Sequence, residues 1–206
     1  VGGTFLAAGR QDNLVSVHAS TRALIAADCP DIALMAAFDH EEVGSGTSSG
    51  ASGPLLETVL ARIALAYGFS QDQRYQMLAR STCVSSDAGH SVNPNYAEFH
   101  DPDQYPVMGR GPMIKINANQ RYASDARGQA LWLRACHEAG EATQEFVSNN
   151  AVSCGTTIGP LTATRLGIAT VDVGVPLLSM HSVRELSSIR DDVALSNIMK
   201  GYWNLA

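Results

Sequence analysis

The feature that most constrains this chain is a pair of adjacent carboxylates that follows an apolar run. Residues 32–38 read IALMAAF, and Glu41 and Glu42 follow after two intervening residues. A short apolar run of this kind predicts a buried strand. Carboxylates at the end of such a strand are costly to bury unless a positive group holds them. A divalent metal ion is the usual solution, so the pair predicts a metal-binding edge of a sheet.

Strand-like and helix-like segments alternate along the chain. Helical patterns begin near Asp12 and after residues 155–160, and others cover residues 54–67, 71–79, 124–139 and 183–205. Strands are expected over residues 32–38, up to 85–87, and over 113–117, 146–153, 168–173 and 177–181. A long proline-containing loop is expected over residues 88–111. This alternation predicts an α/β fold with a mostly parallel sheet and helices on both faces.

Five residues of metal-binding chemistry fall at predicted strand ends or at a helix start. They are Asp12, Glu41, Glu42, Asp87 and His181. Ligand sites in parallel sheets form outside the carboxyl ends of the strands, so these side chains are candidates for one dinuclear site. Each has a simpler alternative: Asp12 as a helix cap, Asp87 as a turn former, and His181 as a hydrogen-bonded structural histidine. The residue pattern alone leaves these alternatives open.

Composition narrows the class of protein. The 206 residues fit one domain, and the net charge of −6 argues against a general nucleic-acid binder, which would be basic. The four scattered cysteines form no CxxC pair, which favours free thiols in a reducing, cytoplasmic setting. We expect no membrane span, because no apolar stretch approaches about 20 residues. We also expect a processed chain or a piece of a longer protein, since the sequence opens on Val1 without an initiator Met or a signal peptide.

Several short motifs resemble, in order, those of the aspartyl aminopeptidases, a family of co-catalytic dizinc exopeptidases. The resemblance covers nearly the whole chain, and it implies a three-layer sandwich with a mostly parallel mixed sheet, the phosphorylase/hydrolase-like fold of co-catalytic zinc peptidases. The matching segments are residues 9–14, 38–45, 86–90, 93–96, 111–115, 119–124, 155–160 and 179–185.

The resemblance implies specific roles for the candidate residues. Asp12 would bridge two zinc ions, Glu42 and His181 would complete the protein ligands of one ion, and Asp87 would bind the other. Glu41 would stay off the metals as the general base, taking a proton from the bridging water and later delivering it to the leaving amine. Glu41 and Asp87 would also contact the substrate.

The resemblance further implies a substrate site for peptides with an acidic amino-terminal residue. His90 would contact the substrate and help to stabilise the oxyanion, while Lys115 and Tyr122 would bind the acidic side chain. Without the resemblance, His90 is more simply a solvent-facing loop histidine and Lys115 a surface lysine after a strand.

One departure from the family pattern bears on the domain assignment. Family members carry another zinc-binding His, a further substrate-contacting His and an inserted assembly domain upstream of the motif at residues 9–14, and nothing here precedes Val1. His18 and His40 are not expected to replace the missing ligand. We therefore expect residues 1–206 to form the carboxyl-terminal major part of the dizinc catalytic domain.

Three functions remain open at this point. The first is a metalloaminopeptidase that releases amino-terminal Asp and Glu. The second is a related dizinc hydrolase of other specificity, and the third is a non-catalytic assembly fragment. The resemblance also implies a homo-oligomer, since relatives form dodecamers, with neither nucleic acid nor membrane as a partner.

Overall fold

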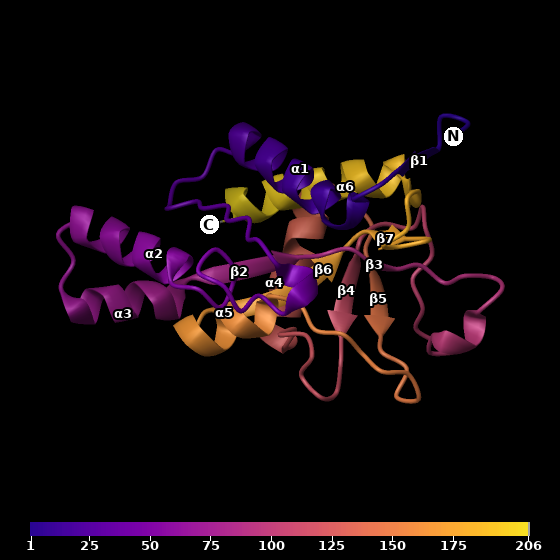
Figure 1. Ribbon diagram of the computed structural model, residues 1–206. Helices are drawn as coiled ribbons and strands as arrows, with labels where there is room; N and C mark the ends of the chain where they lie inside the picture. Colours follow the sequence, from indigo (N-terminus) through magenta and orange to yellow (C-terminus); the bar gives the residue numbers. More distant parts are fainter. Residues whose placement is uncertain (206) are drawn as a thin grey trace.

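Residues 1–205 are described by a computed structural model, a mixed α/β fold built on a four-stranded sheet (Figure 1). The strands lie in the order β2 (Thr82–Ser86), β6 (Ala169–Gly174), β4 (Met113–Ile116) and β5 (Gln144–Val147). β2 is parallel to β6 and β4 is parallel to β5, whereas β4 and β6 are antiparallel. The predicted mostly parallel mixed sheet is confirmed.

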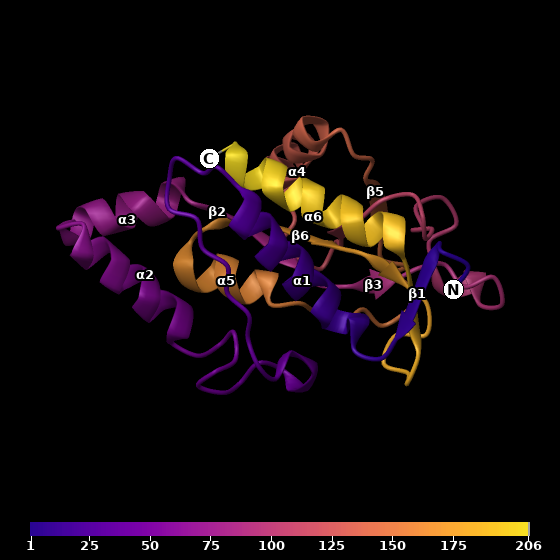
Figure 2. The same cartoon turned by 90° about the horizontal axis from the view of Figure 1, so that it is seen from above.

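Helices cover both faces of the sheet and make the fold three-layered. α1 (Gln11–Ala26), α4 (Ala126–Ala139) and α6 (Ile189–Asn204) pack together on one side, and α5 (Gly159–Leu166) lies on the other (Figures 1 and 2). The predicted helices near Asp12, over 124–139 and after 155–160 are therefore confirmed. None of the helices within residues 1–205 is both long and apolar enough to cross a membrane.

Strand β6 shows why the helices divide between the faces. Val171 and Val173 are fully buried in the core that α1, α4 and α6 complete. Asp172, between them, projects to the other face, where it accepts hydrogen bonds from the Ala123 N–H (2.6 Å) and the Thr157 hydroxyl (2.7 Å). Because side chains alternate along a strand, one segment serves an apolar core and a polar loop cluster.

Two short strand pairs extend the architecture. β3 (Gly89–His90) is parallel to β7 (Pro176–Leu177) and continues the β2–β6 ladder past Asp87. β1 (Phe5–Ala8) is antiparallel to β8 (Glu185–Ser188). The second pair was not predicted from the sequence, and it places residues 5–8 against residues 185–188 beside the start of α1.

Two further helices, α2 (Leu55–Ala66) and α3 (Gln71–Arg80), project from one end of the sheet (Figures 1 and 2). The sequence predicted both, α2 as an amphipathic helix with an apolar stripe and α3 as a short polar helix. α3 begins with a capping box, in which the Ser70 side chain accepts from the Gln73 N–H and the Gln73 side chain accepts from the Ser70 N–H.

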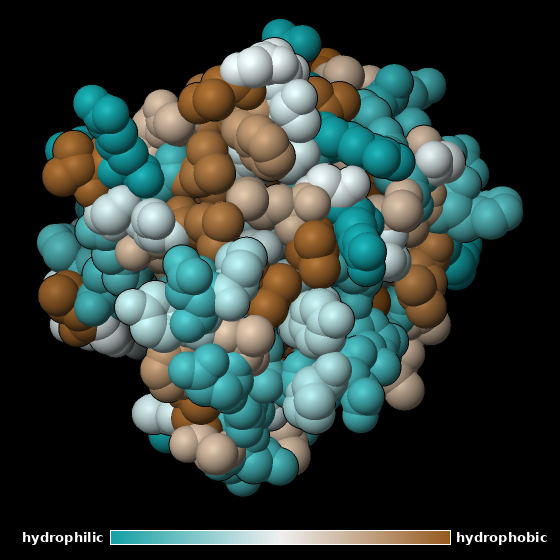
Figure 3. Space-filling view, turned by 90° about the vertical axis from the view of Figure 1, so that its right-hand side faces the viewer, coloured by the Kyte–Doolittle hydropathy of each residue, from teal (hydrophilic) through white to brown (hydrophobic). Residues whose placement is uncertain are grey.

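The long loop predicted over residues 88–111 is interrupted by β3, after which an irregular segment runs to β4. It carries the short 3₁₀ helix η2 (Ala97–Phe99) and lies at the end of the molecule opposite α2 and α3. Figure 3 looks onto this end, where hydrophobic and hydrophilic residues are interspersed over the visible surface.

The prediction of a strand over residues 32–38 was wrong. The segment is extended but forms no strand ladder within residues 1–205. Ala33 and Met35 pack against the core, while Ile32 is 43% exposed. The apolar pattern correctly identified partial burial, but a strand also requires a hydrogen-bonded neighbour, and pattern alone does not supply one.

Three other boundaries also differ from prediction. The strand expected over 146–153 is β5, which ends at Val147, and that expected over 177–181 ends at Leu177. The helix expected from 183 begins only at Ile189, because residues 185–188 pair with β1. In each case a tertiary pairing decides a boundary that local composition leaves undefined.

Candidate metal centre

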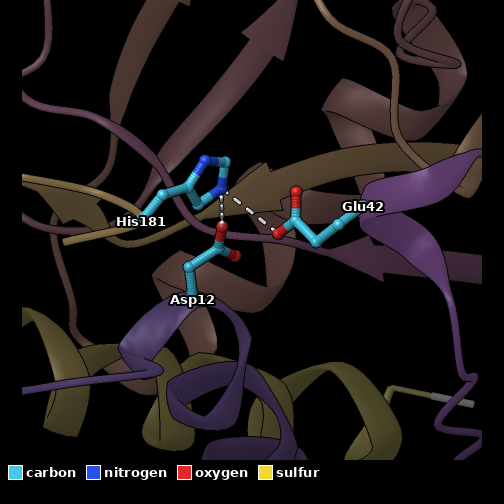
Figure 4. A group of neighbouring side chains, drawn as sticks. All are labelled: Asp12, Glu42 and His181. Carbon is cyan, nitrogen blue, oxygen red and sulfur yellow. Dashed lines mark hydrogen bonds and ion pairs between the residues drawn. The ribbon is translucent and has the colours of Figure 1, made fainter. Parts of the chain in front are cut away.

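Three predicted ligands, Asp12, Glu42 and His181, converge from distant parts of the chain (Figure 4). The His181 Nε2 atom lies 3.0 Å from Asp12 Oδ2 and 3.2 Å from Glu42 Oε1. One ligand atom from each residue lies within 4.8 Å of the others. This spacing is compact enough for all three side chains to reach one cation.

Asp12 reaches the centre from the first turn of α1, directly after β1. Its backbone is not yet helical, with φ −79° and ψ 107°, so the carboxylate points away from the helix. The helix N-cap is Arg10, and Asp12 binds His181 instead of capping. The helix-cap alternative for Asp12 is therefore wrong. Its side chain is only 5% exposed, and its Oδ1 atom has no hydrogen-bond partner within residues 1–205.

The glutamate pair lies on a 3₁₀ turn and not at the end of a strand. The turn, η1 (Glu41–Val43), begins after His40 and ends at Gly44, which both have a positive φ. Glu42 points to His181 with its side chain 58% exposed, whereas Glu41 is half-buried and stays outside the three-residue cluster. The two neighbours therefore lie in different environments.

His181 lies in the loop between β7 and β8, and not on the strand expected for it. Its φ is 65°, in the left-handed region that a residue with a side chain rarely adopts. The ring is 60% exposed and contacts both Asp12 and Glu42. The centre is thus buried on the Asp12 side and open on the His181 and Glu42 side.

The fourth predicted ligand, Asp87, lies between β2 and β3 and is bound by a lysine. The Lys115 Nζ atom donates to Asp87 Oδ2 at 2.7 Å and to the Ala88 carbonyl oxygen at 2.8 Å. Lys115 is only 2% exposed, which rules out the surface-lysine alternative. Gly174 allows this arrangement, since a Cβ there would overlap the Asp87 carbonyl oxygen.

The predicted substrate residues surround this ion pair. The Lys115 Nζ atom lies 5.5 Å from the centre of the Tyr122 ring, and Tyr122 is 8% exposed. His90 is on β3, three residues after Asp87, and is exposed. Partial loss of water on the protein side of its ring, followed by the charges of His100 and Lys115, lowers the pKa of His90. A neutral, exposed imidazole at this position has an N–H available to donate.

Crowded carboxylates dominate the electrostatics of the centre. Burial, reinforced by the charges of Asp87 and Glu42, raises the pKa of Asp12 to about 7. The same causes, burial first, raise the pKa of Glu41 to about 7. Loss of water lowers the pKa of His181, but Glu42 and Asp12 outweigh it and leave that pKa raised. The centre therefore has an excess of negative charge that a cation would offset.

The donor set fits a divalent metal ion. Two carboxylates and an imidazole are ordinary ligands of zinc. The buried Asp12 Oδ1 atom, with no partner in the described part of the chain, is available to a cation. Asp87 lies close enough to raise the pKa of both Asp12 and Glu41, so its carboxylate is a further donor beside the three-residue cluster.

Two residues that fix the backbones of the candidate ligands were missed from the sequence. The Glu185 carboxylate accepts from the N–H groups of Asp12 and His181, and the Asn13 side chain bonds the backbone on both sides of Asp87, at Ser86 O and Ala88 N–H. Glu185 was placed on a predicted helix, which concealed its pairing in β8. Both residues fall within the matching segments 9–14 and 179–185, but neither was given a role from the sequence.

Comparison with known protein families gives one match over nearly the whole chain. The model of the family described as Aminopeptidase I zinc metalloprotease (M18) matches residues 1–203. A probable M18 family aminopeptidase 2 from Streptomyces coelicolor is 51% identical over 202 residues. That match covers 96% of this chain and 47% of the relative, so the chain spans about half the length of the curated relatives it matches.

Solved structures give the same family. Yeast aminopeptidase 1 superposes with a TM-score of 0.84 at 30% identity, covering all of this chain and 48% of the yeast chain. A second structure, from S. cerevisiae, is a dodecamer and matches with a TM-score of 0.83, 30% identity and the same coverage. An M18 aminopeptidase from Thermotoga maritima gives a TM-score of 0.86 at 25% identity, over 97% of this chain and 46% of that one.

Proposed function

Because this chain belongs to the M18 family of zinc aminopeptidases, we propose that the protein releases amino-terminal Asp and Glu residues from peptides, with two zinc ions at the Asp12 centre. The observation that carries this proposal is the convergence of Asp12, Glu42 and His181 beside a buried lysine, Lys115. Metal ligands and a cation for an acidic side chain are the two components that such a reaction needs.

The proposal gives each ligand a position. Asp12 would contact both ions, Glu42 and His181 one of them, and Asp87 the other. Zinc supplies Lewis acidity here, lowering the pKa of a water molecule and polarising the scissile carbonyl group. The burial of the Asp12 side chain supports a bridging role, because a carboxylate with little access to water gains most from two neighbouring cations.

Glu41 is the proposed general base. It would take a proton onto a carboxylate oxygen and later deliver that proton to the departing amine. Its position outside the three-ligand cluster supports this role, and so does its pKa of about 7, raised by burial and by Asp87 and Glu42. A base with a pKa near the working pH exchanges protons in both directions.

The remaining residues would hold the substrate. His90 would donate an N–H to the scissile carbonyl oxygen as negative charge develops there. Lys115 and Tyr122 would bind the acidic side chain of the first residue, with the Lys115 ammonium as the charge partner. The burial of Lys115 supports this arrangement, since a charge pair away from water discriminates strongly between acidic and neutral partners.

One observation favours a second candidate, a dizinc aminopeptidase of other specificity. Lys115 already donates to Asp87 and to the Ala88 carbonyl, so two of its three donors have partners within the protein. If those bonds persist with substrate present, the lysine is a structural element of the site, and another feature selects the substrate.

A substrate panel separates these candidates. Chromogenic amides of Asp, Glu, Leu and Lys would be assayed with the zinc-loaded protein, and the zinc content would be measured by plasma mass spectrometry. Two zinc ions per chain with a strong preference for Asp and Glu support the proposal. Two zinc ions with a preference for Leu or Lys support the second candidate. Full zinc content with no turnover of any amide contradicts both and favours a non-catalytic assembly role.

The proposal extends to assembly and location. We propose a homo-oligomer, supported by the dodecamer of the yeast relative, and residence in the cytoplasm, supported by the four free cysteines. Sedimentation velocity of the purified protein tests the first statement. Fractionation of the source cells followed by immunoblotting tests the second.

A further inference from the structure

Glu185 is a buried carboxylate joined to the backbones of two candidate metal ligands. It is the first residue of β8 and is only 1% exposed. Its Oε2 atom accepts the N–H of Asp12 at 3.0 Å, and its Oε1 atom accepts the N–H of His181 at 2.6 Å. Both carboxylate oxygens are therefore occupied by the peptide groups of ligand residues.

These two hydrogen bonds connect segments that are far apart in the chain. Asp12 and Glu185 are 173 positions apart, whereas His181 and Glu185 are four apart. The Glu185 main chain is itself held, because its carbonyl oxygen accepts from Gln11 Nε2 at 2.7 Å and its strand pairs with β1 at Ala8. One rigidly held side chain thus sets the distance between the start of α1 and the loop of His181.

The backbone of His181 particularly needs this support. Its φ of 65° is unfavourable for a residue with a Cβ, by about 1–3 kcal/mol for such conformations in general. A short hydrogen bond from its N–H to a charged acceptor is stronger than a neutral one and stabilises that conformation. The bond keeps the imidazole turned toward Asp12 and Glu42.

Glu185 also has no ion-pair partner within residues 1–205. A buried carboxylate without a cation is costly unless hydrogen bonds and a nearby positive charge compensate it. Its two hydrogen bonds supply part of that compensation. The cations proposed for the adjoining centre would supply the rest.

We propose that Glu185 is a positioning residue of the metal centre, which fixes the Asp12 and His181 backbones so that their side chains meet at one ion. This inference rests on the proposed function, since it assumes that the centre binds zinc. It predicts that Glu185 controls metal affinity and coordination geometry without touching the metal or the substrate.

The test is Glu185→Gln in the protein as its own gene encodes it. Gln keeps the size of the side chain but turns an NH₂ group toward one of the two N–H donors, so one bond is lost. Residues that orient metal ligands typically change affinity by about 10–100-fold. We expect zinc to bind about 10–100-fold more weakly, as measured by competition with a chromophoric chelator. The visible absorption bands of the cobalt-substituted protein should also shift.

Asp191→Asn is the matched control. Asp191 is fully buried at the start of α6 and accepts two backbone N–H groups, those of Gly109 at 2.6 Å and Gly111 at 2.8 Å, but neither belongs to a candidate ligand. It repeats the chemistry of Glu185 away from the centre. We expect this variant to lower the melting temperature while leaving the zinc affinity and the cobalt spectrum unchanged.

A second variant, Glu185→Asp, keeps the charge but is one methylene shorter, so it can reach only one of the two N–H groups. It should bind zinc more weakly than the parent, and it provides the test if Glu185→Gln fails to fold. Parental affinity and spectrum in either folded variant, or an equal loss in Asp191→Asn, would overturn the positioning role. Absence of zinc binding in the parent protein would instead overturn the proposed function, and with it this inference.

Discussion

Replacing Lys115 with Met tests whether this buried ammonium stabilises the folded protein in the absence of substrate. Met preserves most of the aliphatic stem, so the change removes the charge and two hydrogen bonds without opening a large cavity. The Asp87 carboxylate, 2.7 Å from Nζ, and the Ala88 carbonyl, 2.8 Å away, both lose their partner.

The structure sets the size of the expected effect. Removing one partner of a buried ion pair costs about 3–5 kcal/mol, because the other charge stays behind. The Asp87 side chain is 18% exposed, so water replaces part of the lost interaction. We therefore expect a loss of about 3 kcal/mol in the free energy of unfolding, at the low end of that range.

Urea unfolding in the presence of EDTA measures this loss, with the fluorescence of the two buried tryptophans, Trp132 and Trp203, as the signal. Asp87→Asn and the double variant complete a thermodynamic cycle. The sum of the losses in unfolding free energy of the two single variants should exceed the loss of the double variant. Zinc should narrow the difference between Lys115→Met and the parent, because the proposed second ion would become the partner of Asp87. A loss below about 0.5 kcal/mol would refute the reasoning, since that is the effect of an ordinary surface substitution.

Three further predictions concern the centre and Asp192, a carboxylate in the first turn of α6. Glu41→Gln should lower turnover by about 10²–10⁴-fold with unchanged zinc content, since it removes a proton acceptor and no ligand; near-parental activity at full zinc content would contradict its role as the base. Asp12→Ala should lose nearly all zinc in metal analysis and His181→Ala only part of it, because Asp12 is proposed to bind both ions and His181 only one. Equal zinc contents in the two variants would contradict a bridging Asp12. Burial, with the charge of Asp191 added, raises the pKa of Asp192 to about 6, so its ionisation disfavours folding above that pH. At pH values above about 6, Asp192→Asn should therefore raise the melting temperature, and this gain should shrink as the pH falls toward about 4. A gain in melting temperature that calorimetry finds independent of pH would contradict this cause.

The residue types of the centre were predictable, although Glu42 and His181 lie on a 3₁₀ turn and in a loop and not at strand ends. Asp12, Glu42 and His181 were chosen as metal-binding residue types at element ends, and they lie together in the structure. Their roles as zinc ligands remain predictions. Asp87 was placed correctly after β2, but its bond to Lys115 was not foreseen, because that lysine reaches it from another strand, β4.

By itself, the sequence determined that helices and strands alternate around a mostly parallel sheet, because this alternation follows from apolar periodicities of a few positions. Only the tertiary structure decided which distant segments meet. It left residues 32–38 without a strand partner in the described chain, paired β1 with β8, and brought Glu185 to Asp12 across 173 positions. The physical reason is that an apolar or charged side chain indicates what kind of environment it needs, whereas the partner that satisfies it depends on how the whole chain packs.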